Sequence, residues 1–177
     1  MRSSVAERTP LLYGLPPIGD AGSRVLILGS FPSGASLRAQ EYYAHPRNNF
    51  WRIMEDLFGI DRSGNYEERA AGLIEHRIAV WDVIGQCRRE GSADQAIEDA
   101  APNDLTGWLG EHQGVRGIAF NGAKAEDTTR RSVPSLFTWP GIAERRFPST
   151  SPANASISLA SKLAAWAQIK DWAEYDA

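Results

Sequence analysis

The sequence contains a single cysteine, Cys87, among its 177 residues. One cysteine excludes a disulfide within the chain, and it excludes a zinc site or an iron–sulfur cluster held by several cysteines of one chain. We expect Cys87 to pack in the core rather than to act as a reactive thiol. The three histidines, His45, His76 and His112, lack metal-ligand spacing, so we expect neither a metal nor an organic cofactor.

Long apolar runs are also missing from the sequence. No stretch approaches the roughly 20 residues that a membrane-spanning helix needs, and the first residues do not form a basic and then apolar leader. A cytoplasmic protein without membrane contact is therefore the default expectation. The length and the 42% of hydrophobic residues suit one core, so we expect a single, monomeric domain over residues 1–177.

A strong basic excess is absent as well, because the formal net charge is −3. Proteins that bind nucleic acid through broad electrostatic attraction usually carry an excess of lysine and arginine, so this class is disfavoured. Basic residues nevertheless gather in short clusters, among them those around Arg47 and Lys124. If the fold brings such clusters to one face, they form a local phosphate-binding surface; otherwise they are solvated side chains, and the sequence leaves both interpretations open.

The stretch from Val25 to Trp51 organises the rest of the chain. Its first residues, up to Leu28, are apolar and predict a strand buried on both faces, which ends in a turn rich in glycine, serine and proline. That turn lacks the lysine of a P-loop and the three-glycine dinucleotide fingerprint. Two tyrosines, an arginine and two asparagines follow before a helix that starts near Phe50. Aromatic rings beside amides suit a flat, polar ligand such as a nucleobase.

Two further apolar runs, at 78–83 and 115–120, predict strands that also end in polar turns. Residues 1–22 predict an irregular arm, residues 85–91 a polar segment and residues 142–147 at best a short, irregular strand. Helical patterns cover five more segments: 67–75, 92–100, 105–109, 123–131 and 157–172. This alternation of strands and helices predicts an α/β fold with a mostly parallel sheet between helices. Ligands of such sheets bind beyond the carboxyl ends of the strands.

Asp82 is an acid inside the second apolar run. A buried carboxylate costs several kcal/mol unless it is paired or hydrogen-bonded. Two interpretations remain open from the residues alone. In the first, Asp82 lies at the strand end and caps the next turn; in the second, it accepts a hydrogen bond from an N–H group of a ligand.

Five motifs follow one another along the chain: GSFPS at 29–33, HPRNNFW at 45–51, WDVIG at 81–85, FNG at 120–122 and PSTSPANA at 148–155. Each alone is a weak signal, but in this order they resemble the uracil-DNA glycosylase superfamily, most closely its sixth family, the hypoxanthine-DNA (deoxyinosine) glycosylases. The resemblance runs from about Leu15 to Trp166. It implies a three-layer α/β/α fold around a central, mostly parallel four-stranded sheet. It also implies a monofunctional DNA glycosylase for deaminated bases, acting on DNA in base excision repair without a cofactor.

The resemblance also assigns the residue that positions the attacking water. Many superfamily members carry a polar residue for this role at the end of the first strand, where this chain has Phe31. As in the sixth family, the role passes to the following segment, and here the matching residue is Asn48, with Asn49 as the second choice. Tyr43 lies where relatives stack an aromatic ring on the flipped base. Read without the resemblance, the two asparagines are helix caps and Tyr43 is a packing residue.

Asp82 matches the position at which uracil-specific members read the base with an asparagine. An ionised aspartate only accepts hydrogen bonds, which suits the N–H of hypoxanthine or of uracil. Backbone N–H groups of the GSFPS turn are expected to bond a base carbonyl. The base-binding residues expected from the resemblance are Ser30, Phe31, Tyr43, Asp82 and Asn121.

The STSPAN segment resembles the superfamily loop that pinches phosphates in the minor groove and fills the gap left by the flipped nucleotide. Ser149 replaces the usual histidine, which argues against histidine-assisted stabilisation of the leaving base. The residues expected to contact DNA are Ser33, Arg47, Lys124, Ser149, Ser151, Pro152 and Asn154. Two alternatives remain: a uracil-selective glycosylase, and a binding module of the same fold that has lost catalysis.

Overall fold

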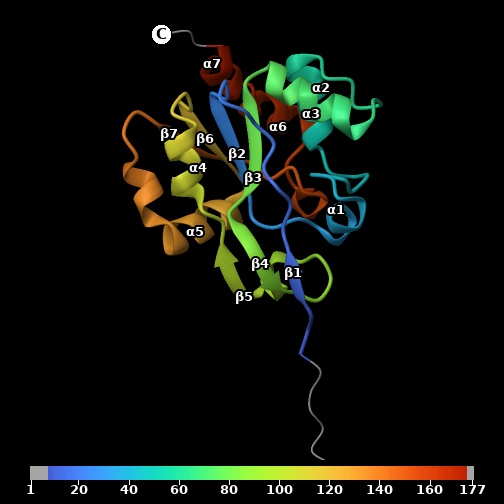
Figure 1. Ribbon diagram of the computed structural model, residues 1–177. Helices are drawn as coiled ribbons and strands as arrows, with labels where there is room; N and C mark the ends of the chain where they lie inside the picture. The colour runs from blue at the N-terminus through green and yellow to red at the C-terminus, as the bar shows by residue number, and fades with distance from the viewer. Residues whose placement is uncertain (1–7, 175–177) are drawn as a thin grey trace, which may run out of the picture.

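The computed structural model describes residues 8–174, and a four-stranded parallel sheet with the strand order β3-β2-β6-β7 forms its centre (Figure 1). The strands are β2 (Val25–Gly29), β3 (Ile78–Asp82), β6 (Gly117–Asn121) and β7 (Ala143–Phe147). β2 pairs in parallel with β3 and with β6, and β6 pairs in parallel with β7. Every residue of β2 is buried, which explains its unbroken apolar sequence.

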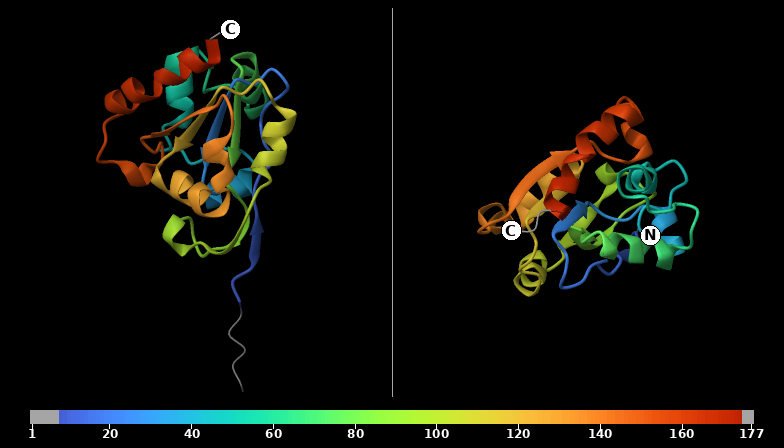
Figure 2. Two further views of the ribbon diagram at one scale, coloured as in Figure 1. Left: turned by 90° about the vertical axis from the view of Figure 1, so that its left-hand side faces the viewer. Right: turned by 90° about the horizontal axis from the view of Figure 1, so that it is seen from above.

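Helices cover both faces of this sheet, as Figures 1 and 2 show. Val25 and Ile27 of β2 contact one apolar cluster, whereas Leu26 and Leu28 contact the other, because successive side chains of a strand point to opposite faces. The first cluster includes residues of α2 (Phe50–Phe58), α3 (Tyr66–Glu75), α6 (Leu159–Trp166) and α7 (Gln168–Glu174). The second includes residues of α4 (Leu105–Glu111) and α5 (Ala123–Ser132). The expected three-layer α/β/α fold is confirmed.

A second, antiparallel sheet with the order β1-β4-β5 lies at the carboxyl end of β3 (Figure 1). It consists of β1 (Leu11–Tyr13), β4 (Ile84–Arg88) and β5 (Glu98–Pro102), and a short 3-10 helix, η1 (Asp94–Ala96), lies between β4 and β5. Its central strand begins two residues after Asp82. The small sheet is therefore a direct extension of the end of the parallel sheet at which ligands are expected.

The antiparallel sheet corrects three predictions. The irregular arm predicted over 1–22 contains β1, and Ile18 forms a further bridge with Val80; residues 1–7 lie outside the described residues. The polar segment predicted over 85–91 contains most of β4. The helix predicted over 92–100 is replaced by η1 and the start of β5. Pairing with strands distant in sequence overrides the helical composition of these residues.

The remaining boundaries differ less from the sequence prediction. The expected C-terminal helix over 157–172 is divided into α6 and α7, and its N-cap is Ser158 rather than Ser156. Cys87 is buried, as expected, beside Phe31 and Ile84. Two shorter elements follow the β2 turn and the β7 turn: α1 (Gly34–Ala39) and the 3-10 helix η3 (Pro152–Asn154). A further 3-10 helix, η2 (Pro134–Thr138), follows α5. Over residues 8–174, no helix has the length and apolar character that crossing a membrane requires.

Candidate active site

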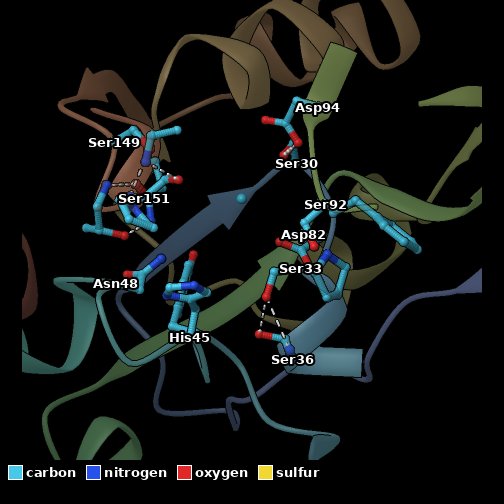
Figure 3. A pocket seen from close by; sticks show the side chains of 18 of the residues that line it. Ser30, Ser33, Ser36, His45, Asn48, Asp82, Ser92, Asp94, Ser149 and Ser151 are labelled. Atoms are coloured by element: carbon cyan, nitrogen blue, oxygen red, sulfur yellow. Dashed lines mark hydrogen bonds between the residues drawn. The ribbon is translucent and has the colours of Figure 1, made fainter. Parts of the chain in front are cut away.

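A cavity of about 430 Å³ lies at the carboxyl ends of β2, β3 and β6 (Figure 3). Its lining comes from all five sequence motifs: the turn after β2, the loop before α2, the ends of β3 and β6, and the loop after β7. A sixth segment, residues 92–95 between β4 and β5, completes the lining. The volume falls within the range of roughly 300–1,000 Å³ that is typical of small-molecule sites. The cavity is therefore large enough to hold a nucleobase.

One side of the cavity, which we call the acid wall, is formed by Ser30, Asp82 and Asp94 (Figure 3). Asp82 ends β3 and is only 4% exposed, and its Oδ2 has no hydrogen-bond partner within the described part of the chain. Burial, and then the negative charge of Asp94, raise the pKa of Asp82 to about 7, whereas the nearby Arg89 lowers it. The carboxyl group is thus poised to change protonation state near neutral pH.

The backbone of Asp82, not its carboxyl group, holds the turn after β3. Asn103 Nδ2 donates a hydrogen bond to the Asp82 carbonyl oxygen at 2.8 Å. This arrangement favours the interpretation in which the side chain is directed to a ligand. Gly29 makes room for it, because a Cβ at this position would lie 2.4 Å from Asp82 Oδ1 and 3.3 Å from the Tyr43 hydroxyl.

Three hydrogen bonds fix the segment 89–94 against the turn after β2. The Ser30 hydroxyl donates to Asp94 Oδ1 at 2.9 Å, and the Gly34 N–H donates to Ser92 Oγ at 2.8 Å. Behind them, the buried Arg89 donates from Nη2 to the Pro32 carbonyl at 2.6 Å. The sequence did not indicate that this segment lines the cavity. Its composition is typical of a helix, and Asp94 lies outside the five motifs.

Asn48, Ser149 and Ser151 lie on the opposite side (Figure 3). Together with Thr150 and its hydrogen-bond partner Asn121, which also line the cavity, they form what we call the loop wall. Asn121 Nδ2 donates to Thr150 Oγ1 at 2.9 Å, and the Thr150 N–H donates back to Asn121 Oδ1 at 2.9 Å. The Asn49 N–H also donates to the Thr150 carbonyl at 2.9 Å. Asn121 lines the cavity as expected, but both ends of its amide are already paired. In the structure it holds the loop in place.

The two neighbouring asparagines differ in position. Asn48 lines the cavity, and its Oδ1 accepts a hydrogen bond from the Phe50 N–H at 2.9 Å. Asn49 is the N-cap residue of α2; its side chain makes no capping hydrogen bond, and it is absent from the described cavity lining. The structure therefore combines the two interpretations at Asn48: its side chain both satisfies the start of a helix and faces the cavity.

Tyr43 lines the cavity next to Asp82 and adopts a left-handed backbone conformation with φ of 56°. Its ring stacks on Phe50 with centroids 4.1 Å apart. Its buried hydroxyl makes no hydrogen bond of normal geometry among residues 8–174; burial and then the Asp82 charge raise its pKa, whereas the nearby Asn121 side chain lowers it. Its neighbour Tyr42 is a packing residue, because its ring is buried and its hydroxyl hydrogen-bonds to the Leu15 and Pro16 carbonyls.

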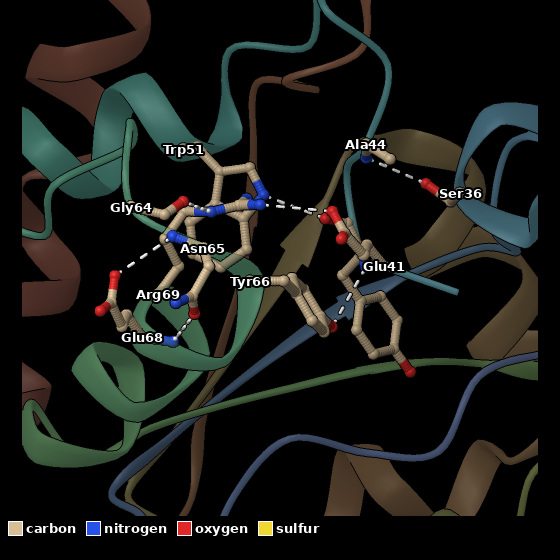
Figure 4. A network of polar contacts seen from close by, with 10 residues as sticks. Ser36, Glu41, Ala44, Trp51, Gly64, Asn65, Tyr66, Glu68 and Arg69 are labelled. Atoms are coloured by element: carbon tan, nitrogen blue, oxygen red, sulfur yellow. Dashed lines mark hydrogen bonds and ion pairs between the residues drawn. The ribbon is translucent and has the colours of Figure 1, made fainter. Parts of the chain in front are cut away.

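A polar network around Arg69 holds the loop that carries Tyr43 and Asn48 (Figure 4). Arg69 forms an ion pair with Glu41 at 3.3 Å, and its guanidinium lies 4.6 Å from the centre of the Trp51 ring. The Tyr42 N–H donates to the Tyr66 hydroxyl. This network fixes both ends of the loop. It thereby holds Tyr43 and Asn48, which lie between these ends, in their positions at the cavity.

Of the seven residues expected to contact DNA, all except Arg47 line the cavity or the hollow beside it. Ser33 lines it and caps α1 by accepting from the Ser36 N–H, and Arg47 is exposed. A second hollow adjoins the cavity and is lined by Lys124, at the start of α5, and by Arg146. Ser149, Ser151 and Asn154 line this hollow too, whereas Pro152 lines the cavity. Lys124 and Arg146 thus line the hollow that continues the loop wall, and the Arg146 guanidinium also forms ion pairs with Glu126 and Asp127.

Comparison with known proteins gives results that agree with this geometry. The sequence model of the Uracil DNA glycosylase superfamily matches residues 16–171. A hypoxanthine DNA glycosylase of Methanosarcina barkeri is 33% identical over 156 residues, which cover 88% of this chain and 95% of the relative. A hypoxanthine DNA glycosylase of Methanosarcina acetivorans is 37% identical over 146 residues, which cover 82% of this chain and 89% of the relative.

A solved structure supports the same grouping. The solution NMR structure of a candidate uracil DNA glycosylase from Methanosarcina acetivorans has a TM-score of 0.79 and 34% identity, covering 94% of this chain and all of that one. The family match extends over most of the chain and includes every segment that lines the cavity. This chain belongs to the uracil DNA glycosylase superfamily.

Proposed function

We propose that this protein is a monofunctional DNA glycosylase that removes deaminated bases from DNA, hypoxanthine first and uracil second, by hydrolysing the N-glycosidic bond. The observation that carries the proposal is the cavity with two unlike walls, one acidic and one built from amides and hydroxyls. The superfamily membership and the two relatives named hypoxanthine DNA glycosylases support it.

A base inside a duplex cannot reach such a cavity, so the nucleotide must rotate out of the stack. With the base between the walls, its hydrogen-bonding edge faces Asp82 and its glycosidic bond faces Asn48, which lies across the cavity (Figure 3). The loop wall continues into the hollow lined by Lys124 and Arg146, where the phosphates on either side of the flipped nucleotide would bind. The arrangement thus separates base reading from phosphate binding.

In the proposed reaction, Asn48 orients the water that attacks the sugar. Its Oδ1 already accepts from the Phe50 N–H, and a carbonyl oxygen retains a second lone pair for a water proton. An amide does not take up a proton fully, but it need not do so when the water attacks a nearly formed oxocarbenium ion. The departing base carries away the bonding electrons, and backbone N–H groups in the turn after β2 stabilise its negative charge. The proton that the water loses passes to solvent, and the base anion takes up a proton from solvent.

The Asp82 carboxyl group can pair with more than one base. Hypoxanthine and uracil share an N–H group beside a carbonyl, and the carboxyl group of Asp82 reads that pair rather than the rest of the ring. The solved structure that is similar to this chain is named as a candidate uracil DNA glycosylase, and this name supports uracil as the second substrate.

The test uses labelled oligonucleotides that carry one hypoxanthine, uracil or xanthine, as single strands and opposite each base, with abasic sites broken by hot alkali. We expect strand breaks at hypoxanthine. Asn48→Ala should lower the rate by about 10²-fold, since displacing a positioned reactant costs that much. Asn49→Ala is the matched control and should cleave nearly as well as the wild type, because its side chain makes no capping bond.

Thermal melting of the three proteins separates folding from catalysis. Loss of the Asn48 hydrogen bond to the start of α2 should cost about 1 kcal/mol, which leaves the fold intact. A wild-type protein that binds the oligonucleotides and breaks none of them would contradict the enzyme and leave a damage-binding module. Equal rates for Asn48→Ala and the wild type would contradict the role of Asn48.

A further inference from the structure

We propose that Asp94 is a specificity-determining residue of the cavity. It accepts a hydrogen bond from the Ser30 hydroxyl and places a second negative charge on the same side of the cavity as Asp82, so that the acid wall pairs with a base edge in which an N–H adjoins a carbonyl. This inference rests on the proposed function and adds a residue to it from outside the five sequence motifs.

Hydrogen bonds on the neighbouring residues fix the position of Asp94. It lies in η1, between two strands of the small antiparallel sheet, and it lines both the cavity and the adjoining hollow. The Ser92 and Arg89 hydrogen bonds described above clamp its segment to the turn after β2. Asp94 therefore stands at a fixed place on the same side of the cavity as Asp82 (Figure 3).

The hydrogen bond to Asp94 decides what Ser30 offers a ligand. A serine hydroxyl has one proton and two lone pairs. Because Ser30 donates its proton to Asp94 Oδ1 at 2.9 Å, its oxygen is left to accept from a ligand N–H. A cavity without Asp94 would leave this hydroxyl free to donate or accept, and its selectivity for an N–H would be lost.

The groups around Asp82 determine its protonation state. Asp94 faces it from the β4–β5 connection and Arg89 from the end of β4, and Tyr43 and Tyr42 lie close on the loop before α2. Nε and Nη2 of Arg89 donate to the backbone carbonyls of Gly91 and Pro32, and this single guanidinium faces two carboxyl groups. Burial first and the Asp94 charge second raise the pKa of Asp82 to about 7. Protonating Asp82 leaves one negative and one positive charge in this part of the protein.

A protonated carboxyl group presents an O–H donor and a carbonyl acceptor side by side. This pair matches a lactam edge, in which the base carbonyl accepts and the base N–H donates. The O–H also stabilises the negative charge that develops on the departing base. An ionised Asp82 accepts the N–H but repels the carbonyl, so the cleavage rate should fall as the pH rises through the pKa of Asp82.

Asp94→Asn separates the two actions of Asp94, because it keeps an acceptor oxygen for Ser30 and removes the charge. With the charge gone, ionisation of Asp82 costs less and its pKa falls. The titration midpoint of the Asp82 carboxyl carbon, followed by ¹³C NMR in the free protein, should fall by roughly one pH unit. The high-pH limb of hypoxanthine cleavage should move to lower pH by the same amount.

Two further variants complete the experiment. Ser30→Ala removes the hydrogen bond and keeps the charge, so it should lower kcat/KM without moving the Asp82 midpoint. Asp99→Asn is the matched control: its side chain is 67% exposed on β5 and pairs with Arg88 at the surface, so neither readout should change.

The outcomes separate this inference from the proposed function. If the wild type cleaves hypoxanthine and Asp94→Asn moves neither the midpoint nor the pH limb, the role of Asp94 is overturned and the glycosylase stands. If the midpoint moves and the limb does not, protonation of Asp82 does not govern cleavage and the inference also fails. If the wild type cleaves no substrate, the proposed function fails, and the inference fails with it whatever the NMR titration shows.

Discussion

The two walls of the cavity are built on opposite principles. The acid wall contains a buried carboxyl group, Asp82, with an unpaired oxygen, a second acid beside it and a buried arginine behind it. The loop wall contains uncharged groups, and its central pair, Asn121 and Thr150, exchanges two hydrogen bonds. One wall keeps polar groups available to a ligand, whereas the other uses them to hold its own backbone.

This contrast indicates where the protein accepts a cost in stability. An unpaired buried polar group destabilises the folded state, and such groups persist where a ligand completes them. Three of the four buried side chains with an unpaired polar atom in the described part of the chain, Tyr43, Asp82 and Arg89, lie at or directly behind the acid wall. The loop wall bears no comparable cost, so removing groups from the two walls should change stability in opposite directions.

The largest effect is expected for Asp82→Asn. Raising the pKa of Asp82 from 3.8 to about 7 means that the wild type loses stability as the pH rises from about 4 through about 7. The loss is on the order of 4 kcal/mol. Asparagine does not titrate, so the variant should match the wild type at pH 4 and exceed it at pH 8.

Urea unfolding at both pH values measures this difference. Asp99→Asn serves again as a control, since an exposed pair should add little at either pH. If Asp82→Asn is no more stable than the wild type at pH 8, ionisation of Asp82 does not lower the stability of the folded protein.

Gly29→Ala should break the geometry of the acid wall without changing any charge. The new Cβ would lie 2.4 Å from Asp82 Oδ1, so the carboxyl group must move, and overpacking of this kind costs about 1–3 kcal/mol. Cleavage of hypoxanthine should fall more than tenfold. Gly110→Ala, where a Cβ meets nothing within 4 Å, is the control and should keep full activity. Full activity in Gly29→Ala would mean that the position of Asp82 is not critical.

Thr150→Val tests how much the paired groups of the loop wall stabilise the fold. It keeps the shape of the side chain and removes the hydroxyl that accepts from Asn121 Nδ2, which should cost about 1–2 kcal/mol. Thr128→Val is the matched control, because the Thr128 hydroxyl is buried and has no hydrogen-bond partner among residues 8–174. Chemical denaturation should show a loss for the first variant and none for the second. Equal effects would contradict the distinction between paired and unpaired groups.

Much of the parallel sheet could be predicted from the sequence, because its strands carry local signals, whereas the site residues were expected from the resemblance to the superfamily. β2 is buried on both faces, so its apolar run is visible without knowledge of its partners. Asn48 and Asp82 lie in motifs next to predicted element ends, and both line the cavity. Their proximity follows from parallel pairing, which brings the carboxyl ends of strands to one edge of the sheet.

The antiparallel sheet could not be predicted in the same way. β4 and β5 mix polar with apolar residues, and β4 is stabilised by pairing with β1, which lies far away in the sequence. Such strands depend on their partners rather than on propensity. Since Asp94 reaches the cavity only through this sheet, its place in the cavity lining could not be inferred from its own residue type.

The hydrogen bonds that join the two walls to the rest of the fold have a consequence for the order in which the protein forms. Ser30 and Asp94 are 64 residues apart, and the Asn49 N–H meets the carbonyl of Thr150, from near the other end of the chain. Contacts between such distant residues form slowly, since a long loop must close first. On the ribosome, the segment containing Thr150 emerges only after all four strands of the parallel sheet. The cavity therefore cannot be complete before residues as far apart as Ser30 and Thr150 have come together, and a partly synthesised chain without Thr150 lacks part of the loop wall.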